Sequence, residues 1–427
     1  MTTDIERELD TPSIDDTPEQ AQVATQFEIR FFTKLSDEHK VSDDKIIVPG
    51  AVNRLELSDL VNDMSTIDKR IPYDFLINGE FLRGELTEHC AERGILSEKT
   101  VDVEYVIAMS QPDTVNLNEP EKDWISRVAS NNDVYYTCSL SGSVSMYELG
   151  TGKLMKSVIQ STLPLTGLFC TSSGVLVTAG KDGRVRFANA ETMDVFETSV
   201  CVSPIQCLSV CPFDNSLALT GSTSGEVYLW NIPLSPVESG NSSKKRSSIP
   251  EVPARTELES TTVSGISAIE WISLTRVIVA SLDGTIQVID PISKTYLPTI
   301  NTNRSISALA LLTPKAIVTG HADGRVIFWQ LKSDELYATL EATNSCRSHS
   351  RMITDIKSMP GSETLIASSS VDGTIKLFDS RATSYAVQSV SLPKEERALA
   401  LCWVSPEQIL SGASDGVTRS HKMGLVL

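Results

Sequence analysis

The sequence predicts a mainly β protein in which a ring of seven four-stranded sheets, a β-propeller, follows a small α+β domain. Two observations lead to this prediction. A turn made of one small polar residue and a glycine recurs seven times after residue 124, whereas the stretch before it has a mixed order of strands and helices. With 427 residues, the chain is also longer than the usual single domain of about 100 to 200 residues.

The recurring turn sets the period of the repeat. Successive turns are separated by 41, 42, 59, 40, 49 and 43 positions, and most of these intervals match the ~40 to 45 residues of a four-stranded propeller blade. The 59-residue interval contains a polar stretch rich in Ser and Pro, which we expect to be an insertion loop over residues 233–260. The seven turns are Ser141-Gly142, Asp182-Gly183, Ser224-Gly225, Asp283-Gly284, Asp323-Gly324, Asp372-Gly373 and Asp415-Gly416.

Each turn lies between two apolar strands, as in VLVTAGKDGRVRFAN and LIASSSVDGTIKLFD. A tight hairpin needs positive φ, which Gly accepts freely and Asp tolerates. Trp230, Trp329 and Phe378 then occupy the aromatic position of the following strand, where we expect them to pack between neighbouring blades.

These repeats resemble the WD-repeat family over residues 124–427, although the Trp-Asp pair that names the family is degenerate throughout, as in Trp230-Asn231 and Phe378-Asp379. A propeller normally closes by pairing a strand from one end of the chain with the last blade. We therefore expect the linker of residues 107–123 to supply the closing strand, within residues 107–120.

Blade six contains three residue types of a hydrolase triad. In WD repeats, however, a histidine, a serine, the turn aspartate and the aromatic residue commonly form a structural hydrogen-bond relay. The resemblance assigns that role to His349, Ser370, Asp372 and Phe378. Because no G-x-S-x-G elbow or oxyanion loop accompanies them, we expect no catalytic site, and the protein is predicted not to be an enzyme.

Residues 27–106 have a different pattern, with strands and helices in a ββαββ-like order. In the first expected helix, Leu57, Leu60, Val61 and Met64 form one apolar stripe that can lie across a twisted sheet. A ubiquitin-like α+β fold satisfies this pattern. Residues 1–26 carry seven acidic side chains without apolar periodicity and are predicted to be a disordered tail.

Composition excludes several classes of function. A net charge of -18 repels phosphate backbones and anionic lipids, and neither a signal peptide nor a membrane-spanning apolar run is present. The eight cysteines show no CxxC pair and no nearby histidine, so we interpret them as reduced core residues and predict no metal within the chain and no cofactor. The protein is therefore predicted to be soluble and intracellular.

A more specific resemblance appears before the repeats. The stretches IRFFTK, IIVPGAVNRLELSDLVN, IPYDFLINGEFLRGEL and VDVEY, followed by DWISRV, resemble the Notchless-like amino-terminal domain and its junction with a propeller. Seven turns favour the ribosome-biogenesis family of WD repeat-containing protein twelve, because Notchless proteins have eight blades. A WD-repeat substrate receptor of a ubiquitin ligase is the alternative from another class.

The resemblance implies a nuclear scaffold, present in the nucleolus and nucleoplasm. It would mature the large (60S) ribosomal subunit and pre-rRNA together with pescadillo and the block-of-proliferation WD protein. It also implies that the ubiquitin-like domain docks on the ATPase midasin, where a loop carboxylate completes the coordination of a Mg²⁺ in the MIDAS domain and leads to release from pre-60S particles. By the family's spacing, seven residues before Tyr105, this carboxylate is Glu98; because the preceding stretch is one residue short, Glu92 is the second candidate.

A short basic run lies in the expected insertion loop. Lys244, Lys245 and Arg246 are flanked by serines and are candidates for a nuclear import signal, with a local rRNA contact or a solvated loop as alternatives.

Overall fold

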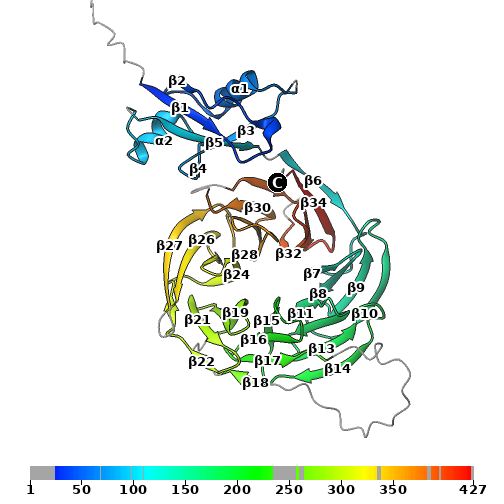
Figure 1. Cartoon of the computed structure of the whole chain (residues 1–427). Helices are drawn as coiled ribbons and strands as arrows, with labels where there is room; N and C mark the ends of the chain where they lie inside the picture. Colours follow the sequence, from blue (N-terminus) through cyan, green and yellow to red (C-terminus); the bar gives the residue numbers. More distant parts are fainter. Residues whose placement is uncertain are drawn as a thin grey trace, which may run out of the picture. The chain divides into compact units, whose positions relative to one another are not determined.

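The computed structural model describes residues 25–67, 69–97, 99–108, 110–233, 256–258, 264–333, 338–381, 386–393 and 396–424. The chain divides between residues 108 and 109 into two compact units (Figure 1). Both units are built mainly from strands, which confirms the predicted fold class.

The first unit is a five-stranded sheet in the order β2-β1-β5-β3-β4, with β1 and β5 parallel and the other pairs antiparallel. Asn53 caps helix α1 in a capping box with Glu56. From the predicted stripe of α1, Leu57 and Val61 are fully buried in the core of this unit, and Leu60 and Met64 pack at its edge. The elements are β1 (Gln26–Phe32), the 3-10 helix η1 (Asp37–His39), β2 (Lys45–Pro49), α1 (Arg54–Met64), β3 (Tyr73–Ile77), β4 (Glu80–Phe81), α2 (Leu86–Glu92) and β5 (Val101–Ile107).

The second unit is a ring of seven sheets in the described residues (Figure 1). The first three blades follow one another along the chain, and each runs from an innermost to an outermost strand. Blade one contains β7 (Ile125–Asn131), β8 (Val134–Ser139), β9 (Ser143–Glu148) and β10 (Leu154–Ile159). Blade two contains β11 (Leu165–Cys170), β12 (Val175–Gly180), β13 (Arg184–Asn189) and β14 (Val195–Val200). Blade three contains β15 (Ile205–Val210), β16 (Leu217–Ser222), β17 (Val227–Asn231) and β18 (Thr256–Leu258).

The remaining blades have the same plan, with an additional short strand in blade four. Blade four contains β19 (Ile266–Ser273), β20 (Arg276–Ser281), β21 (Thr285–Asp290), β22 (Thr295–Tyr296) and β23 (Ile300–Asn301). Blade five contains β24 (Ile306–Thr313), β25 (Ala316–His321), β26 (Arg325–Ser333) and β27 (Ala338–Arg347). Blade six contains β28 (Ile353–Ser358), β29 (Leu365–Ser370), β30 (Thr374–Asp379) and β31 (Gln388–Ser391). Blade seven contains β32 (Ala398–Ser405), β33 (Gln408–Ala413), β34 (Thr418–Gly424) and β6 (Ser110–Asn116).

Strand β6 completes the last blade although it precedes the first one in the chain. It pairs antiparallel with β34, and innermost strand β32 contacts β7 of blade one. Residue Asn118 continues this contact, because its Oδ1 accepts a 2.6 Å hydrogen bond from the N–H of Thr418. Residues about 300 positions apart therefore meet where the ring closes.

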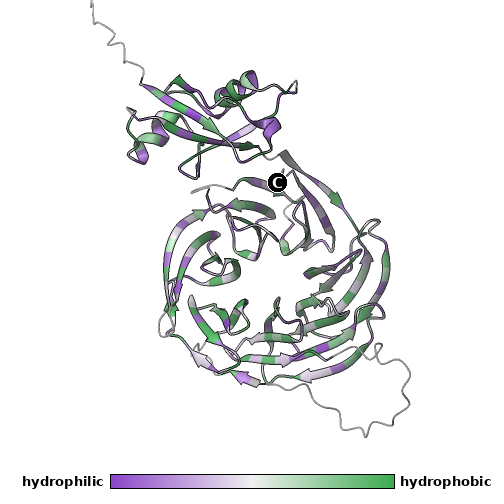
Figure 2. Cartoon of the chain, in the orientation of Figure 1, coloured by the Kyte–Doolittle hydropathy of each residue, from purple (hydrophilic) through white to green (hydrophobic). Residues whose placement is uncertain are grey.

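The seven recurring turns all join the second and third strands of a blade, and each of their glycines has positive φ. The hydrophobic cores lie between neighbouring blades, as in the cluster that joins blades two and three around Trp230. Figure 2 shows hydrophobic residues recurring along the strands of both units. Blade seven packs on blade one in the same way, with Leu410 and Ala400 against Tyr135 and Tyr147.

One expectation from the sequence differs from the structure. The predicted insertion loop of residues 233–260 contains strand β18, which pairs with β17 as the fourth strand of blade three. Three residues, Thr-Glu-Leu, are too few to show a period in the sequence, and only pairing with β17 defines them as a strand. Residues 234–255 of this stretch, with the basic run Lys244, Lys245 and Arg246, lie outside the described residues.

Candidate functional site

The first predicted site residue, Glu98, lies outside the described residues, but the segments on either side of it are well defined. Helix α2 ends at Glu92; Gly94, two residues later, has a φ of +66°, and the N–H of Ile95 returns to the carbonyl of Cys90 at 2.9 Å. Ile95 then packs on the core of the first unit. On the other side, Thr100 hydrogen-bonds to Glu28 and accepts a 2.8 Å hydrogen bond from Lys45. The segment that leads into the loop before β5 is thus held by α2 and the core, and the segment after this loop by β1 and β2.

Glu92, the second candidate, is the last residue of α2 and its side chain is exposed. One of its carboxylate oxygens pairs with the guanidinium of Arg93 at 3.0 Å, and Arg93 also pairs with Glu80. An exposed ion pair of this kind contributes about 0 to 1 kcal/mol, so it can be exchanged for another partner at little cost.

The predicted relay of blade six is present around a buried histidine, with one change of residue. His349 Nε2 lies 2.7 Å from the hydroxyl of Ser368, and His349 Nδ1 lies 2.9 Å from Thr374 Oγ1 and 3.4 Å from the Asp372 carboxylate. Ser370 is not among the hydrogen-bond partners of the histidine. It lies at the end of β29, where its hydroxyl donates to the carbonyls of Met352 and Arg351.

The two serines explain this difference. Ser368 and Ser370 point to the same side of β29 because side chains alternate along a strand, so the sequence pattern cannot distinguish them. Ser368 forms the hydrogen bond because the folded chain places the imidazole of His349 beside Ser368. The ring of Phe378 lies beside the imidazole, with the ring centroids 6.4 Å apart.

The electrostatics of the relay agree with a structural role. Burial lowers the pKa of His349 to about 4, against the opposing influence of Asp372. Burial of Asp372 would raise the pKa of its carboxyl, but hydrogen bonds from Thr374 and the N–H of Ser350 lower it on balance. At neutral pH a neutral imidazole therefore links a strand hydroxyl to an ionised turn carboxylate.

Two further histidine relays were not predicted from the sequence. In blade five, His321 Nε2 lies 2.8 Å from Thr319 Oγ1, which also accepts a hydrogen bond from the indole N–H of Trp329. In blade seven, His421 bridges Ser411 of β33 and Thr114 of β6, at 2.8 and 2.9 Å. Thr319 and His321 are two residues apart and therefore lie on one face of a strand, so their relay could have been predicted from the sequence. Thr114 and His421 are brought together only by ring closure.

The described residues offer little for a metal. All eight cysteines are free, and seven of them are buried. Burial raises the pKa of Cys207 to about 12, which keeps its thiol protonated. In the described part of the chain, no group of three or more His, Cys, Asp or Glu side chains is arranged to hold a metal ion. None of the described helices combines the length and the hydrophobicity needed to cross a membrane.

Comparison with known proteins gives two domain matches. The family model of the NLE (NUC135) domain matches residues 27–90, which lie in the first unit. The model of the WD domain, G-beta repeat, matches residues 340–379, from β27 to the end of β30.

Similar proteins span nearly the whole chain. The ribosome biogenesis protein YTM1 of Vanderwaltozyma polyspora is 26% identical, over 93% of this chain and 98% of its own length. YTM1 of Saccharomyces cerevisiae is 25% identical, over 93% and 97%, and the ribosome biogenesis protein WDR12 homolog of Drosophila persimilis is 24% identical, over 92% and 95%. The resemblance recognised from the sequence is confirmed: the chain joins an NLE domain to a WD-repeat propeller, and proteins named ribosome biogenesis protein YTM1 and WDR12 homolog are similar to it over more than nine tenths of its length.

Proposed function

We propose that this protein is a non-catalytic scaffold in the maturation of the large ribosomal subunit. The observation that carries the proposal is its similarity, over more than nine tenths of the chain, to proteins named for ribosome biogenesis. Seven blades in the described residues favour this assignment over a Notchless-type factor, for which we expect an eighth blade. The relays described above are structural, which agrees with a protein that works by binding.

The proposed partners follow from the family resemblance. The propeller would hold a pescadillo-type and a block-of-proliferation type protein on the pre-60S particle, in the nucleolus and nucleoplasm. The ubiquitin-like NLE domain would dock on the midasin ATPase, with the carboxylate of Glu98 as a ligand of the Mg²⁺ in its MIDAS domain. Mg²⁺ requires oxygen ligands in near-octahedral geometry, so one firmly held carboxylate can dominate such a contact. The contacts that hold the segments on either side of the loop before β5 support the proposal.

The test is a Mg²⁺-dependent pull-down of the full chain with the isolated midasin MIDAS domain. We expect Glu98→Ala to abolish binding and Glu98→Asp to weaken it by at least tenfold, because the shorter side chain cannot reach the metal. Glu88→Ala, which changes an exposed glutamate of the same domain, is the matched control and should bind normally. Loss of binding in Glu92→Ala but not in Glu98→Ala would move the contact to Glu92. Normal binding by both variants would reject a carboxylate contact from this loop.

Nuclear import is a separate proposal. Lys244, Lys245 and Arg246 lie in the polar stretch that interrupts blade three, and we propose that they act as an import signal. A triple alanine variant, followed as a fluorescent fusion in cells, should remain in the cytoplasm. Unchanged nuclear entry of that variant would contradict the proposal, and unchanged binding to partners in vitro would show that the variant still folds.

A further inference from the structure

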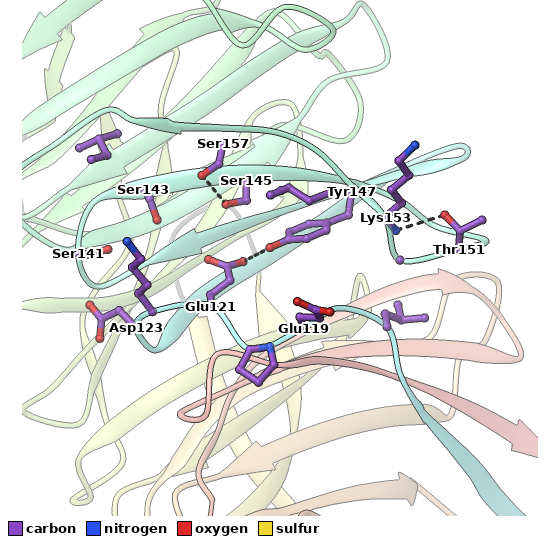
Figure 3. A pocket seen from close by; sticks show the side chains of 16 residues that line it. Glu119, Glu121, Asp123, Ser141, Ser143, Ser145, Tyr147, Thr151, Lys153 and Ser157 are labelled. Atoms are coloured by element: carbon purple, nitrogen blue, oxygen red, sulfur yellow. Dashed lines mark hydrogen bonds between the residues drawn. The ribbon is translucent and has the colours of Figure 1, made fainter.

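A cleft with a volume of about 800 Å³ runs along the outer half of blade one (Figure 3). One wall is the face of β9 and β10, with the hydroxyls of Ser145 and Ser157 in its centre. The other wall is the crossing segment, residues 117–123, which leads from the closing strand β6 to blade one. The proposed function makes no use of this cleft.

The crossing segment is firmly held, so the cleft does not need to form on binding. Its Asn118 is buried and hydrogen-bonds to Thr418 and Gly416 of blade seven. The backbone of Leu117 lies so close to Gly152, at the turn before β10, that a Cβ on Gly152 would clash with the Leu117 carbonyl. The crossing segment is thus anchored to blade seven and to the turn before β10.

Carboxylates outnumber ammonium groups in this cleft. Glu119, Glu121 and Asp123 alternate along the crossing segment and all three line the cleft, whereas its cations are Lys122 and Lys153. Among the described residues, none of these five groups forms an ion pair with another. With the chain's net charge of -18, the local surplus favours a cationic ligand.

Glu121 is the innermost of these acids. Its Oε1 accepts a hydrogen bond from Tyr147 Oη at 2.9 Å (Figure 3) and another from Thr137 Oγ1 at 2.6 Å. Its other oxygen, Oε2, takes part in neither bond. Burial raises the pKa of this carboxyl, which means that its negative charge lacks full compensation, and a cation beside Oε2 would provide it.

Strand β10 gives the cleft an open edge. It pairs with β9 on one side only, and the backbone groups of its other side are not used in the sheet. Edge strands are usually protected by charged side chains, but Leu154, Met155 and Ile159 are 51%, 56% and 77% exposed here. The one charged residue of β10, Lys156, pairs with Asp194 and is not part of the cleft lining. Exposed apolar residues on an edge strand beside a preformed cleft are typical of a site that pairs with an extended peptide.

We infer that this cleft binds an extended basic segment of a partner protein, which adds to β10 as a fifth strand of blade one. A lysine or arginine near the middle of the segment pairs with Glu121, Glu119 and Asp123. Apolar residues at alternate positions, two residues from the basic one, pack on Leu154 and Ile159 because side chains of a strand alternate in direction.

The experiment is a selection of random 12-residue peptides displayed on phage, with the full chain as bait. We expect enriched peptides to carry a basic residue between apolar residues at alternate positions. As a synthetic peptide, the best of them should bind at least tenfold more weakly to Ile159→Glu and to Glu119→Lys. N-methylation of the alternate residues whose N–H groups would bond to β10 should also abolish binding.

Matched variants outside the cleft serve as controls. Val202→Glu also charges a highly exposed apolar residue, and Glu191→Lys also reverses an exposed acid, and both should bind the peptide like the unmodified chain. Absence of enrichment, selection of acidic peptides, or binding that tolerates N-methylation would overturn the proposal. So would dimerisation of the unmodified chain that is lost in Ile159→Glu, because a second copy would then be the ligand.

Discussion

At the scale of single residues, buried histidines and their hydroxyl partners stabilise the propeller. Each of His321, His349 and His421 uses both ring nitrogens in hydrogen bonds, and each connects two strands or a strand and a loop. Burial lowers the pKa of His349 and of His421 to about 4, so both imidazoles are neutral at physiological pH. These groups make stability depend on pH.

The sign of this dependence follows from the direction of the shifts. Because the folded-state pKa values lie near 4 and the unfolded value near 6.5, the unfolded chain binds more protons in this interval, and stability falls as pH decreases through it. Each of the two histidines should cost about 2 kcal/mol of unfolding free energy between pH 7 and pH 5. Urea unfolding of the propeller at both pH values measures this loss.

His349→Gln is the variant that isolates one relay, because glutamine can still bond to Ser368 but does not titrate in this range. The variant should be less stable at pH 7 and should lose about 2 kcal/mol less than the unmodified chain on going to pH 5. An unchanged loss would mean that other groups cause the pH dependence.

At the scale of secondary-structure elements, the recurring turn is the unit that defines a blade. Its glycine has positive φ in every blade, and in most blades the loop before the next blade packs against it. At Gly324, with a φ of +82°, a Cβ would lie 2.2 Å from the carbonyl oxygen of His349. Glycine is therefore required at this turn for two reasons, its backbone conformation and the close approach of the neighbouring loop.

A pair of substitutions separates these two reasons. Gly361 has a similar φ of +79° but no atom within 4 Å of the position of a Cβ. Gly361→Ala should cost about 1 to 2 kcal/mol of unfolding free energy through its backbone conformation alone. Gly324→Ala should cost about 1 to 3 kcal/mol more, because a neighbouring segment must move. Thermal or urea unfolding of both variants measures the two losses of unfolding free energy. Equal losses would show that the clash at Gly324 is relieved without cost.

At the scale of the whole molecule, the ring is closed by residues that lie at opposite ends of the propeller sequence. Strand β6 pairs with β34, Thr114 bonds to His421, and Asn118 joins the crossing segment to Thr418. A closed ring leaves only short edges, so these contacts determine whether blades one and seven stay together.

Asn118→Ala tests this closure. The substitution leaves the buried N–H of Thr418 without its acceptor and should lower the unfolding free energy by about 1 to 3 kcal/mol. Asn116→Ala changes an exposed asparagine two residues earlier and should remain within about 0.5 kcal/mol of the unmodified chain. Faster amide hydrogen exchange in β34 of Asn118→Ala, but not of Asn116→Ala, would place the effect at the closing strand.

The fold class, the seven blades and the amphipathic helix of the first unit could be predicted from the sequence, because they depend on local periods: the spacing of Gly turns, strand alternation and the stripe of Leu57 and Val61. The sequence also indicated the NLE domain and the WD repeats. Three features became visible only in the folded chain: Ser368 rather than Ser370 bonds to His349, Thr256–Leu258 is a strand, and Glu119, Glu121 and Asp123 line a cleft with β10. Each of these features depends on a contact between segments that are remote in the sequence. A local period in the sequence carries no information about such a contact.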